Sequence, residues 1–299
     1  MSHTPVLLHE VIEYLDPKPG KFIIDGTMDG GGHARAIVEK LGSKGTFLGI
    51  DWDLRMVENA EKKIGKKKNV FFAQANYADI PEVLKKKNLP KADGLFLDLG
   101  FSSEQLENSG RGFSFEKDEP LVMTYDDRRT PLFELLRGMK EQELTKILYD
   151  FGGERFARRI ARAIVVRERS KRIETTQELV EVIRGTVPGN YAMRRLNPAT
   201  RTFQALRIYA NDELGNLEKA LQTLPEMLKK DGRAVIISFH SLEDRLVKNY
   251  FRTFSKEGTV KLLTKKPVVA SRNEQETNPR SRSAKLRACS MISSFAQKL

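Results

Sequence analysis

The chain has 299 residues and a formal charge of +12 at pH 7, from 52 lysine and arginine residues against 40 aspartate and glutamate residues. Hydrophobic residues make up 39% of it, which provides a sizeable core and excludes a disordered or collagen-like chain. No apolar stretch approaches the roughly 18 residues of a membrane span, so we expect no membrane partner, and the positive charge favours a polyanion such as nucleic acid.

Cysteine and histidine are scarce. Cys289 is the only cysteine, so the chain can form neither an intramolecular disulfide nor a thiolate metal cage. The four histidines show no zinc-ligand spacing, and the first residues lack the basic flank and apolar run of a secretory signal. We therefore expect a cytoplasmic protein with no metal site.

The first hundred residues alternate short apolar runs with helical patterns. Continuously apolar strands separated by helices are typical of a parallel sheet that is covered on both faces, so we expect an α/β fold with a doubly wound sheet. The expected strands are 21–25, 46–51, 69–73 and 92–99, and the expected helices are 33–41, 53–64 and 79–88.

A glycine-rich turn follows the first expected strand. Gly30, Gly31 and Gly32 precede His33 and a helix, an arrangement that lets backbone approach a ligand beside free helical N–H groups. The turn lacks the Gly-Lys-Ser/Thr of a phosphate-binding P-loop, and Arg35 occupies the third glycine position of the dinucleotide fingerprint. A flexible loop with no ligand therefore remains an alternative.

Polar side chains end the next three strands. Asp51 lies at the position where a strand-end carboxylate binds ribose hydroxyls, whereas Asp53 is better placed to cap the following helix. Tyr77 follows the third strand, where its ring could stack on a base or simply pack. Asp98 ends an otherwise apolar strand, at the edge where such sheets bind ligands. Gln105 either completes a capping box with Ser102 or reaches the ligand.

A helical segment interrupts the sheet. The next convincing strand spans 232–239, so far more chain lies between the fourth and fifth strands than a crossover needs. We expect helices at 131–139, 141–151, 154–169 and 175–184, the last with a Thr175–Glu178 capping box, and a long helix that starts after Asn197 and runs past Leu214. The expected domains are 1–109 and 201–299 for the sheet and 110–200 for the insertion.

The insertion is strongly basic. Residues 150–207 contain 13 arginine or lysine residues against 6 acids, and twelve of the 13 are arginine, whose planar donor fork suits phosphate. On the helix 154–169 an apolar stripe would be buried while the arginines face elsewhere, so we expect RNA contacts there; a solvated surface is the alternative. The candidate RNA contacts are Arg155, Arg158, Arg159, Arg162, Arg194, Arg195 and Arg201, with Arg280, Arg282, Lys285 and Arg287 of the tail as a second group.

The end of the chain supplies the remaining elements. Ser241 and Asp244 begin an expected helix after the fifth strand, and His240 reads more naturally as a structural histidine than as a base. Two final strands, 260–263 and 286–292, are expected on either side of a polar, basic loop.

Seven collinear segments of the sequence resemble bacterial 16S ribosomal RNA cytosine-N4 methyltransferases, which use S-adenosylmethionine. The resemblance covers essentially the whole chain. Its segments are IDGTMDGGGHAR (24–35), LDLGFSSEQLE (97–107), RGFSF (111–115), ERFARRIARAIV (154–165), NPATRTFQALRI (197–208), ISFHSLEDRLVK (237–248) and NPRSRSAKLR (278–287).

The resemblance implies a class I methyltransferase sheet with an inserted, RNA-recognising helical domain, and a cytosine in the decoding region of the small ribosomal subunit as substrate. At residues 119–125 the chain reads EPLVMTY where the family usually has GPLDMRM, so the acid and the arginine of the family's loop are missing here. We therefore do not carry over to this loop a shared role in binding RNA. The implied cofactor contacts are Gly31, Gly32, His33, Asp51, Tyr77, Asp98 and Gln105.

The expected reaction is methyl transfer to an exocyclic nitrogen. Asp98 and the carbonyl of Leu99 would hold the cytosine N4 amine by its hydrogens, by analogy with other amino methyltransferases. Methylation at C5 would need an attacking thiolate, and Cys289 is far in sequence from the cofactor motif. Two further alternatives are a nucleotide-sensing RNA-binding module without turnover and a methyltransferase that acts on DNA or on a protein glutamine.

Overall fold

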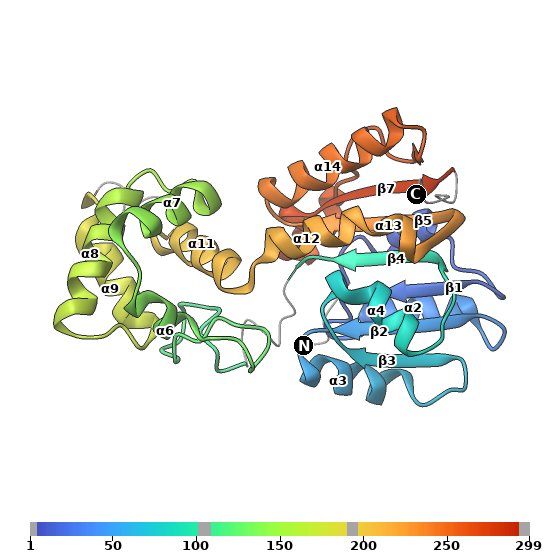
Figure 1. Ribbon diagram of the computed structural model, residues 1–299, viewed down its shortest axis with the longest axis horizontal. Helices are drawn as coiled ribbons and strands as arrows, with labels where there is room; N and C mark the ends of the chain where they lie inside the picture. Colours follow the sequence, from blue (N-terminus) through green and yellow to red (C-terminus); the bar gives the residue numbers. More distant parts are fainter. Residues whose placement is uncertain (1–4, 101–108, 190–196, 293–299) are drawn as a thin grey trace. The chain divides into compact units, whose positions relative to one another are not determined.

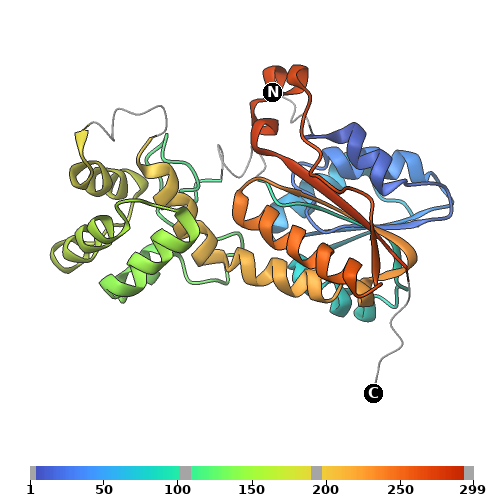
Figure 2. The same ribbon diagram turned by 90° about the horizontal axis from the view of Figure 1, so that it is seen from above.

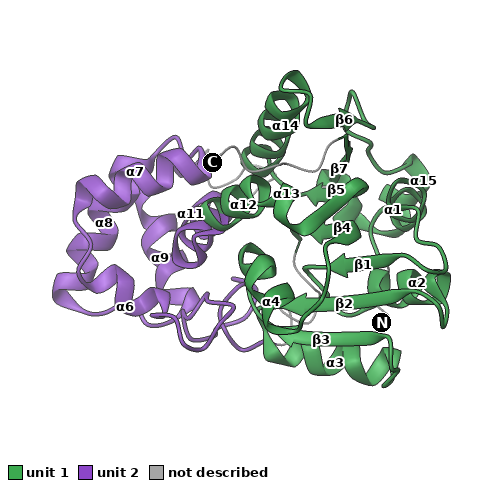
Figure 3. Cartoon of the chain, turned by 45° about the vertical axis from the view of Figure 1, so that its right-hand side comes forward, with its two compact units in different colours: residues 1–102, 214–299 green, residues 103–213 purple. Residues whose placement is uncertain are grey.

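The computed structural model describes residues 5–100, 109–189 and 197–292 and contains two compact units (Figure 3). Unit 1 comprises residues 1–102 and 214–299, and unit 2 comprises residues 103–213. The insertion expected at 110–200 falls within unit 2. Unit 2 ends later than 200 because the helix Ala199–Asn211 contributes Phe203 and Leu206 to the hydrophobic core of that unit.

Unit 1 is built on a sheet whose described strands follow the order β3-β2-β1-β4-β5-β7-β6 (Figure 1). Neighbouring strands are parallel, except that β7 runs antiparallel to β5 and to β6. This is the doubly wound, class I methyltransferase arrangement, so the fold expected from the sequence is confirmed. The strands are β1 (Phe22–Asp25), β2 (Thr46–Asp51), β3 (Val70–Gln74), β4 (Ala92–Asp98), β5 (Leu228–Ser238), β6 (Val260–Leu262) and β7 (Lys285–Met291).

Helices cover both faces of this sheet, which Figure 2 shows nearly edge-on. Successive side chains of a strand point to opposite faces, so Ile23 packs into the core on one face and Ile24 into the core on the other. Burial on both sides explains why the strands are continuously apolar. The first face carries α1 (Leu8–Leu15), α2 (Gly32–Leu41) and α3 (Leu54–Ile64); the second carries α4 (Ile80–Lys86), α12 (Glu213–Gln222), α13 (Leu224–Met227) and α14 (Ser241–Lys256).

Unit 2 is helical and has its own hydrophobic core. Buried leucine, isoleucine and valine side chains from all of its described helices meet there. The capping box expected at Thr175 and Glu178 is present. The helices are α6 (Leu132–Arg137), α7 (Glu141–Gly152), α8 (Ala157–Ser170), α9 (Thr176–Thr186) and α11 (Ala199–Asn211). Within the described ranges, none of the helices of either unit has the length and apolarity needed to span a lipid bilayer.

Three local expectations were wrong. The long helix expected after Asn197 breaks at Asp212, whose φ of 50° ends α11 before α12 begins. The helix expected at Ser241 is confirmed as α14, and His240 caps it, because its side chain accepts from the backbone N–H of Glu243. The loop expected before β7 contains α15 (Arg272–Thr277) and a short turn, η2 (Pro279–Ser283). The helix expected from residue 154 begins only at Ala157.

Candidate active site

Three acidic side chains lie at the carboxyl ends of adjacent strands. Asp25 ends β1, Asp51 ends β2 and Asp98 ends β4, and β1 pairs with both of the other strands. Since the strand order reverses beside β1, these residues mark the switch point at which such sheets bind ligands. Asp29, in the turn after β1, adds a fourth carboxylate to the same edge.

The glycine-rich turn folds tightly between β1 and α2. Gly31 has a φ of 77°, a backbone conformation that favours glycine. A Cβ atom at Gly32 would lie 2.5 Å from Cγ of Pro5, so the bare backbone lets the start of α2 approach the N-terminal segment. The amine of Lys63 donates a 2.6 Å hydrogen bond to the carbonyl of Gly30 and secures the turn to α3.

Asp51 holds the backbone at two points of this strand edge. Its Oδ1 accepts from the N–H of Asp53 at 2.9 Å, and its Oδ2 accepts from the N–H of Asp29 at 3.0 Å. Because each carboxylate oxygen has two acceptor positions, further hydrogen bonds to a ligand's hydroxyls remain possible. Asp53 instead caps α3, as the sequence indicated, by accepting from the N–H of Arg55.

Asp98 is linked to the glycine-rich turn through its backbone and its side chain. Its N–H donates a 2.6 Å hydrogen bond to Oγ1 of Thr27, and its Oδ1 accepts from the N–H of Gly100 at 3.1 Å. The other carboxylate oxygen, Oδ2, lies 3.6 Å from Nδ1 of His33. The end of β4 is therefore held by Thr27 of the turn, and its carboxylate lies beside His33 in the first turn of α2.

The crowded carboxylates resist ionisation. Burial raises the pKa of Asp51 and that of Asp98 to about 7, and Glu243 adds repulsion at Asp98. Burial also raises the pKa of Asp25 and of Asp29 well above the ordinary value, with further repulsion from the neighbouring acids. Oδ2 of Asp25 is buried without a hydrogen-bond partner. A positively charged ligand group would relieve this repulsion.

An aromatic pair lies next to Asp51. The ring of Tyr77, in the short turn η1 (Tyr77–Asp79), stacks on the ring of Trp52 with centroids 6.1 Å apart and planes inclined by 26°. Trp52 follows Asp51 directly in the chain, so the aromatic surface and the strand-end carboxylate are neighbours. That either ring stacks on a base stays a prediction.

The predicted RNA contacts have different surroundings. Gln105, Arg194 and Arg195 lie outside the described residues. Arg155, Arg158, Arg159, Arg162 and Arg201 are all exposed, as expected of a nucleic-acid surface. Arg158 lies 3.8 Å from a carboxylate oxygen of Glu141, and Arg201 donates to the carbonyl of Gly153.

Most of the basic residues of the tail are less available for contact with RNA than the arginines of unit 2. Arg287 is buried, and its Nε donates to Asp244 at 2.6 Å, while Lys285 lies 3.6 Å from the same carboxylate. Arg280 is close enough to Asp29 to lower the pKa of that carboxyl group, against the larger effect of burial. Arg282 is exposed and donates to the carbonyl of Gln275. The pairing of Arg287 and Lys285 with Asp244 makes them structural cations.

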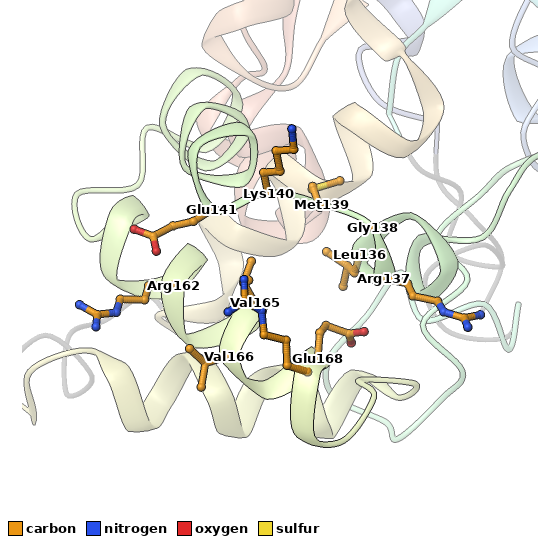
Figure 4. Close-up of a pocket in the computed structure, with 11 residues that line it drawn as sticks. Leu136, Arg137, Gly138, Met139, Lys140, Glu141, Arg162, Val165, Val166 and Glu168 are labelled. Carbon is orange, nitrogen blue, oxygen red and sulfur yellow. The ribbon is translucent and has the colours of Figure 1, made fainter.

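Unit 2 contains a basic pocket between α8 and the segment that joins α6 to α7, with a volume of about 760 Å³ (Figure 4). Its cationic side chains outnumber its two acids, Glu141 and Glu168, and apolar side chains complete the wall. Of the predicted RNA contacts that the structure describes, only Arg162 lines this pocket. The other cations lining it, which the sequence interpretation did not single out, are Arg137, Lys140 and Arg169.

The sequence interpretation also missed residues of the strand edge. Asp25 and Asp29 complete the acidic cluster, Thr27 holds the end of β4, and Trp52 pairs with Tyr77. Both acids were visible in the sequence inside the glycine-rich segment. Only the strand order, which puts β1 between β2 and β4, shows that they face Asp51 and Asp98.

Comparison with known proteins identifies the family to which this chain belongs. The family model of the MraW methylase family matches residues 1–292. The chain belongs to the MraW methylase family. It is 45% identical over 307 aligned positions to the ribosomal RNA small subunit methyltransferase H of Geotalea uraniireducens, covering 97% of this chain and 98% of that protein. It is 42% identical to the protein of the same name from Clostridium botulinum, at 97% and 99% coverage.

A solved structure with a similar fold is a putative rRNA methylase from Clostridium thermocellum, with 9% identity, a TM-score of 0.47, and coverage of 98% of this chain and 100% of that one. As a member of the MraW methylase family, the protein is an S-adenosylmethionine-dependent methyltransferase. The resemblance inferred from the seven sequence segments is thereby confirmed.

Proposed function

We propose that the protein transfers the methyl group of S-adenosylmethionine to the exocyclic N4 of a cytosine in the decoding region of 16S ribosomal RNA. The observation that carries this proposal is the placement of Asp98 at the switch point of the sheet in a chain 45% identical to a ribosomal RNA small subunit methyltransferase H. We further propose that the substrate is the RNA within the small ribosomal subunit and that the protein acts in the cytoplasm.

The strand edge fits the cofactor in shape and charge. The glycine turn places bare backbone at Gly31 and Gly32, and Asp51 retains acceptor capacity for ribose hydroxyls. The unpartnered Oδ2 of Asp25 and the crowded acids suit a ligand that carries positive charge. We assign Gly31, Gly32, His33, Asp51, Tyr77, Asp98 and Gln105 to the cofactor site. When bound there, S-adenosylmethionine supplies a methyl group on a positively charged sulfur.

The acceptor amine needs help from the protein, because the N4 lone pair is conjugated with the cytosine ring. Asp98 and the carbonyl of Leu99 offer two acceptors at the end of β4 for the two amine hydrogens. Held in this way, the amine turns its lone pair toward the methyl group. Positioning of this kind lowers the entropic part of the barrier without a covalent intermediate.

Two competing chemistries find less support. Cys289 is buried within β7, and burial raises the pKa of its thiol to about 12, so it is unsuited to the thiolate attack that C5 methylation requires. His240 caps α14, because its Nδ1 accepts from the backbone N–H of Glu243. It is therefore better explained as a structural residue than as a base.

We assign RNA contact to unit 2. The exposed arginines of α8 present planar donors for phosphate, and the basic pocket adds cations beside an apolar wall. The outward placement of these arginines follows from the burial of Ile160 and Ile164 on the opposite side of the helix.

The decisive experiment supplies labelled S-adenosylmethionine together with small ribosomal subunits, naked ribosomal RNA, DNA or protein, in separate reactions, followed by identification of the methylated product by mass spectrometry. We expect N4-methylcytidine at one site in ribosomal RNA. A C5-methylated cytidine, a methylated DNA base or a methylated glutamine would replace this proposal with the corresponding alternative. RNA binding without any transfer would indicate a module without turnover.

A further inference from the structure

The helix α8 carries apolar side chains on a second face, besides the one that is buried in the core of unit 2. The residues of this second face recur at spacings of three and four, and all of them line the pocket of unit 2: Arg162, Val165, Val166 and Arg169. Val166 is 56% exposed. Because the two valines lie between the two arginines along the helix, the pocket offers apolar surface that is flanked by positive charge.

The segment that joins α6 to α7 supplies further cations to this pocket. Arg137 is the last residue of α6 and Lys140 directly precedes α7, and both are exposed. In Figure 4, Arg137 and Arg162 lie on opposite sides of the pocket, with Leu136 and Val165 between them. The volume of about 760 Å³ is within the range of roughly 300–1,000 Å³ that is typical of small-ligand sites. The pocket therefore has room for one nucleotide and has cations on either side of it.

The two acids of the pocket offset only part of this positive charge. A carboxylate oxygen of Glu141 lies 3.8 Å from Nε of Arg158, a cation that does not line the pocket. Glu168 accepts a 2.7 Å hydrogen bond at Oε1 from the backbone N–H of Ile173, and its Oε2 is buried without a hydrogen-bond partner. Burial raises the pKa of Glu168, which disfavours its negative charge. The pocket therefore keeps a positive balance that attracts phosphate groups.

An unpaired nucleotide of RNA matches this combination of surfaces. Its base and sugar present apolar faces, and the chain carries a phosphate on each side of it. A paired nucleotide does not fit, because its base is stacked inside the duplex. An inorganic phosphate would contact the cations and leave the valines in water, whereas an apolar peptide would cover the valines and leave the cations without partners.

We propose that this pocket holds one unpaired nucleotide of the RNA substrate, with its base and sugar against Val165 and Val166 and its two flanking phosphates bound by the cations of the pocket. This nucleotide is not the one that is methylated, because every described residue that lines the pocket belongs to unit 2 whereas Asp98 belongs to unit 1. The inference rests on the proposed function and adds a separate recognition site for the same RNA.

The first test needs no turnover. Uridine 3′,5′-bisphosphate, a nucleoside with a phosphate on each side, is titrated into the full-length protein saturated with S-adenosylhomocysteine, while the methyl groups of valine are followed by ¹³C NMR. We expect saturable shifts at Val165 and Val166. Inorganic phosphate and uridine should each bind about fivefold more weakly or worse, since each lacks one kind of contact. Shifts confined to other residues, or equal binding of inorganic phosphate, would overturn the proposal.

The second test compares Arg169→Ala with Val166→Ser, two substitutions at exposed positions of α8. Arg169→Ala should weaken RNA binding about fivefold and reduce the slope of log affinity against log salt by about one. Val166→Ser should weaken RNA binding about threefold with an unchanged slope, because it removes apolar contact but no charge. Arg184→Ala, at an exposed arginine of α9 outside the pocket, is the matched control and should bind the bisphosphate as wild type does. Equal losses in Arg169→Ala and Arg184→Ala would overturn the proposal.

Failure of this inference and failure of the proposed function give different results. A protein that methylates RNA but shows no shifts at Val165 and Val166 with the bisphosphate lacks the nucleotide site and keeps its function. A protein that shows these shifts but methylates no RNA keeps the site and loses the proposed function. In steady-state assays, Val166→Ser should raise the KM for RNA. A lower rate at saturating RNA with an unchanged KM would contradict a role in recognition.

Discussion

The hydroxyl oxygen of Thr27 accepts a 2.6 Å hydrogen bond from the backbone N–H of Asp98, and this contact joins the turn after β1 to the end of β4. Thr27→Val keeps the shape of the side chain and removes the acceptor. Leaving the Asp98 N–H unpaired should cost roughly 1–3 kcal/mol of stability. We also expect methyl transfer to slow about tenfold, through displacement of the acid. Thr27→Ser retains the hydroxyl, and equal losses of stability and rate in both variants would contradict this role.

Asp51 and Asp53 form a matched pair of buried acids two residues apart. Asp51→Asn should weaken binding of S-adenosylmethionine by about tenfold or more, since it removes a charged acceptor at the ligand edge. Asp53→Ala removes the cap of α3 and the ion pair of Asp53 with Arg55, at a cost of about 1 kcal/mol of stability, and should leave affinity within twofold. Calorimetry and urea unfolding give the two quantities. Equal affinities in the two variants would exclude Asp51 from the cofactor site.

The raised pKa of Asp98, about 7 in the folded protein, predicts an unusual pH dependence of stability. The unfolded chain releases this proton near its ordinary pKa of about 3.9, so between these values the folded state binds more protons and stability falls as the pH rises. The contribution is at most about 1.4 kcal/mol per pH unit. Urea unfolding from pH 4 to 8 should therefore show a steeper decline for wild type than for Asp98→Asn. Identical slopes would contradict the assignment.

Arg162 is the predicted RNA contact that also lines the pocket of unit 2. Arg162→Glu should weaken RNA binding severalfold and reduce the slope of log affinity against log salt by about one, because one phosphate contact is lost. Arg184, exposed on α9 and away from the pocket, provides the control variant Arg184→Glu. Filter binding at about 50 to 200 mM salt, the range in which phosphate contacts respond strongly, measures the RNA affinity and its salt dependence for the two variants. Equal effects of the two substitutions would indicate general charge attraction instead of a site.

Periodicity and turn chemistry predicted most of unit 1. Every expected strand of the sheet is present, because strands that are buried on both faces must be apolar throughout. Breaks in helices were harder to foresee: Asp212 interrupts an otherwise helical pattern through its left-handed backbone, a conformation its residue type permits but does not require. The capping role of His240 was missed because histidine is an uncommon cap.

The candidate site was predictable one strand at a time. Asp51 and Asp98 stood out because each ends an apolar run, and the structure puts both at the same edge. Their partners depend on pairings between distant segments: Thr27 meets Asp98 only because β1 lies beside β4, and His33 reaches it only because α2 packs on that edge. No local pattern encodes such contacts, so those roles required coordinates.

The interruption of unit 1 between β4 and β5 determines the order in which its sheet can be completed during synthesis. As the chain leaves the ribosome, β4 emerges with the partner β1 already made, yet the strand that will cover its other edge lies beyond all of unit 2. Until then the nascent protein exposes a strongly apolar strand edge, a surface prone to mispairing. Unit 2, which has its own core, can fold during that interval, so vectorial synthesis gives the helical unit its native packing before the Rossmann-like layer closes.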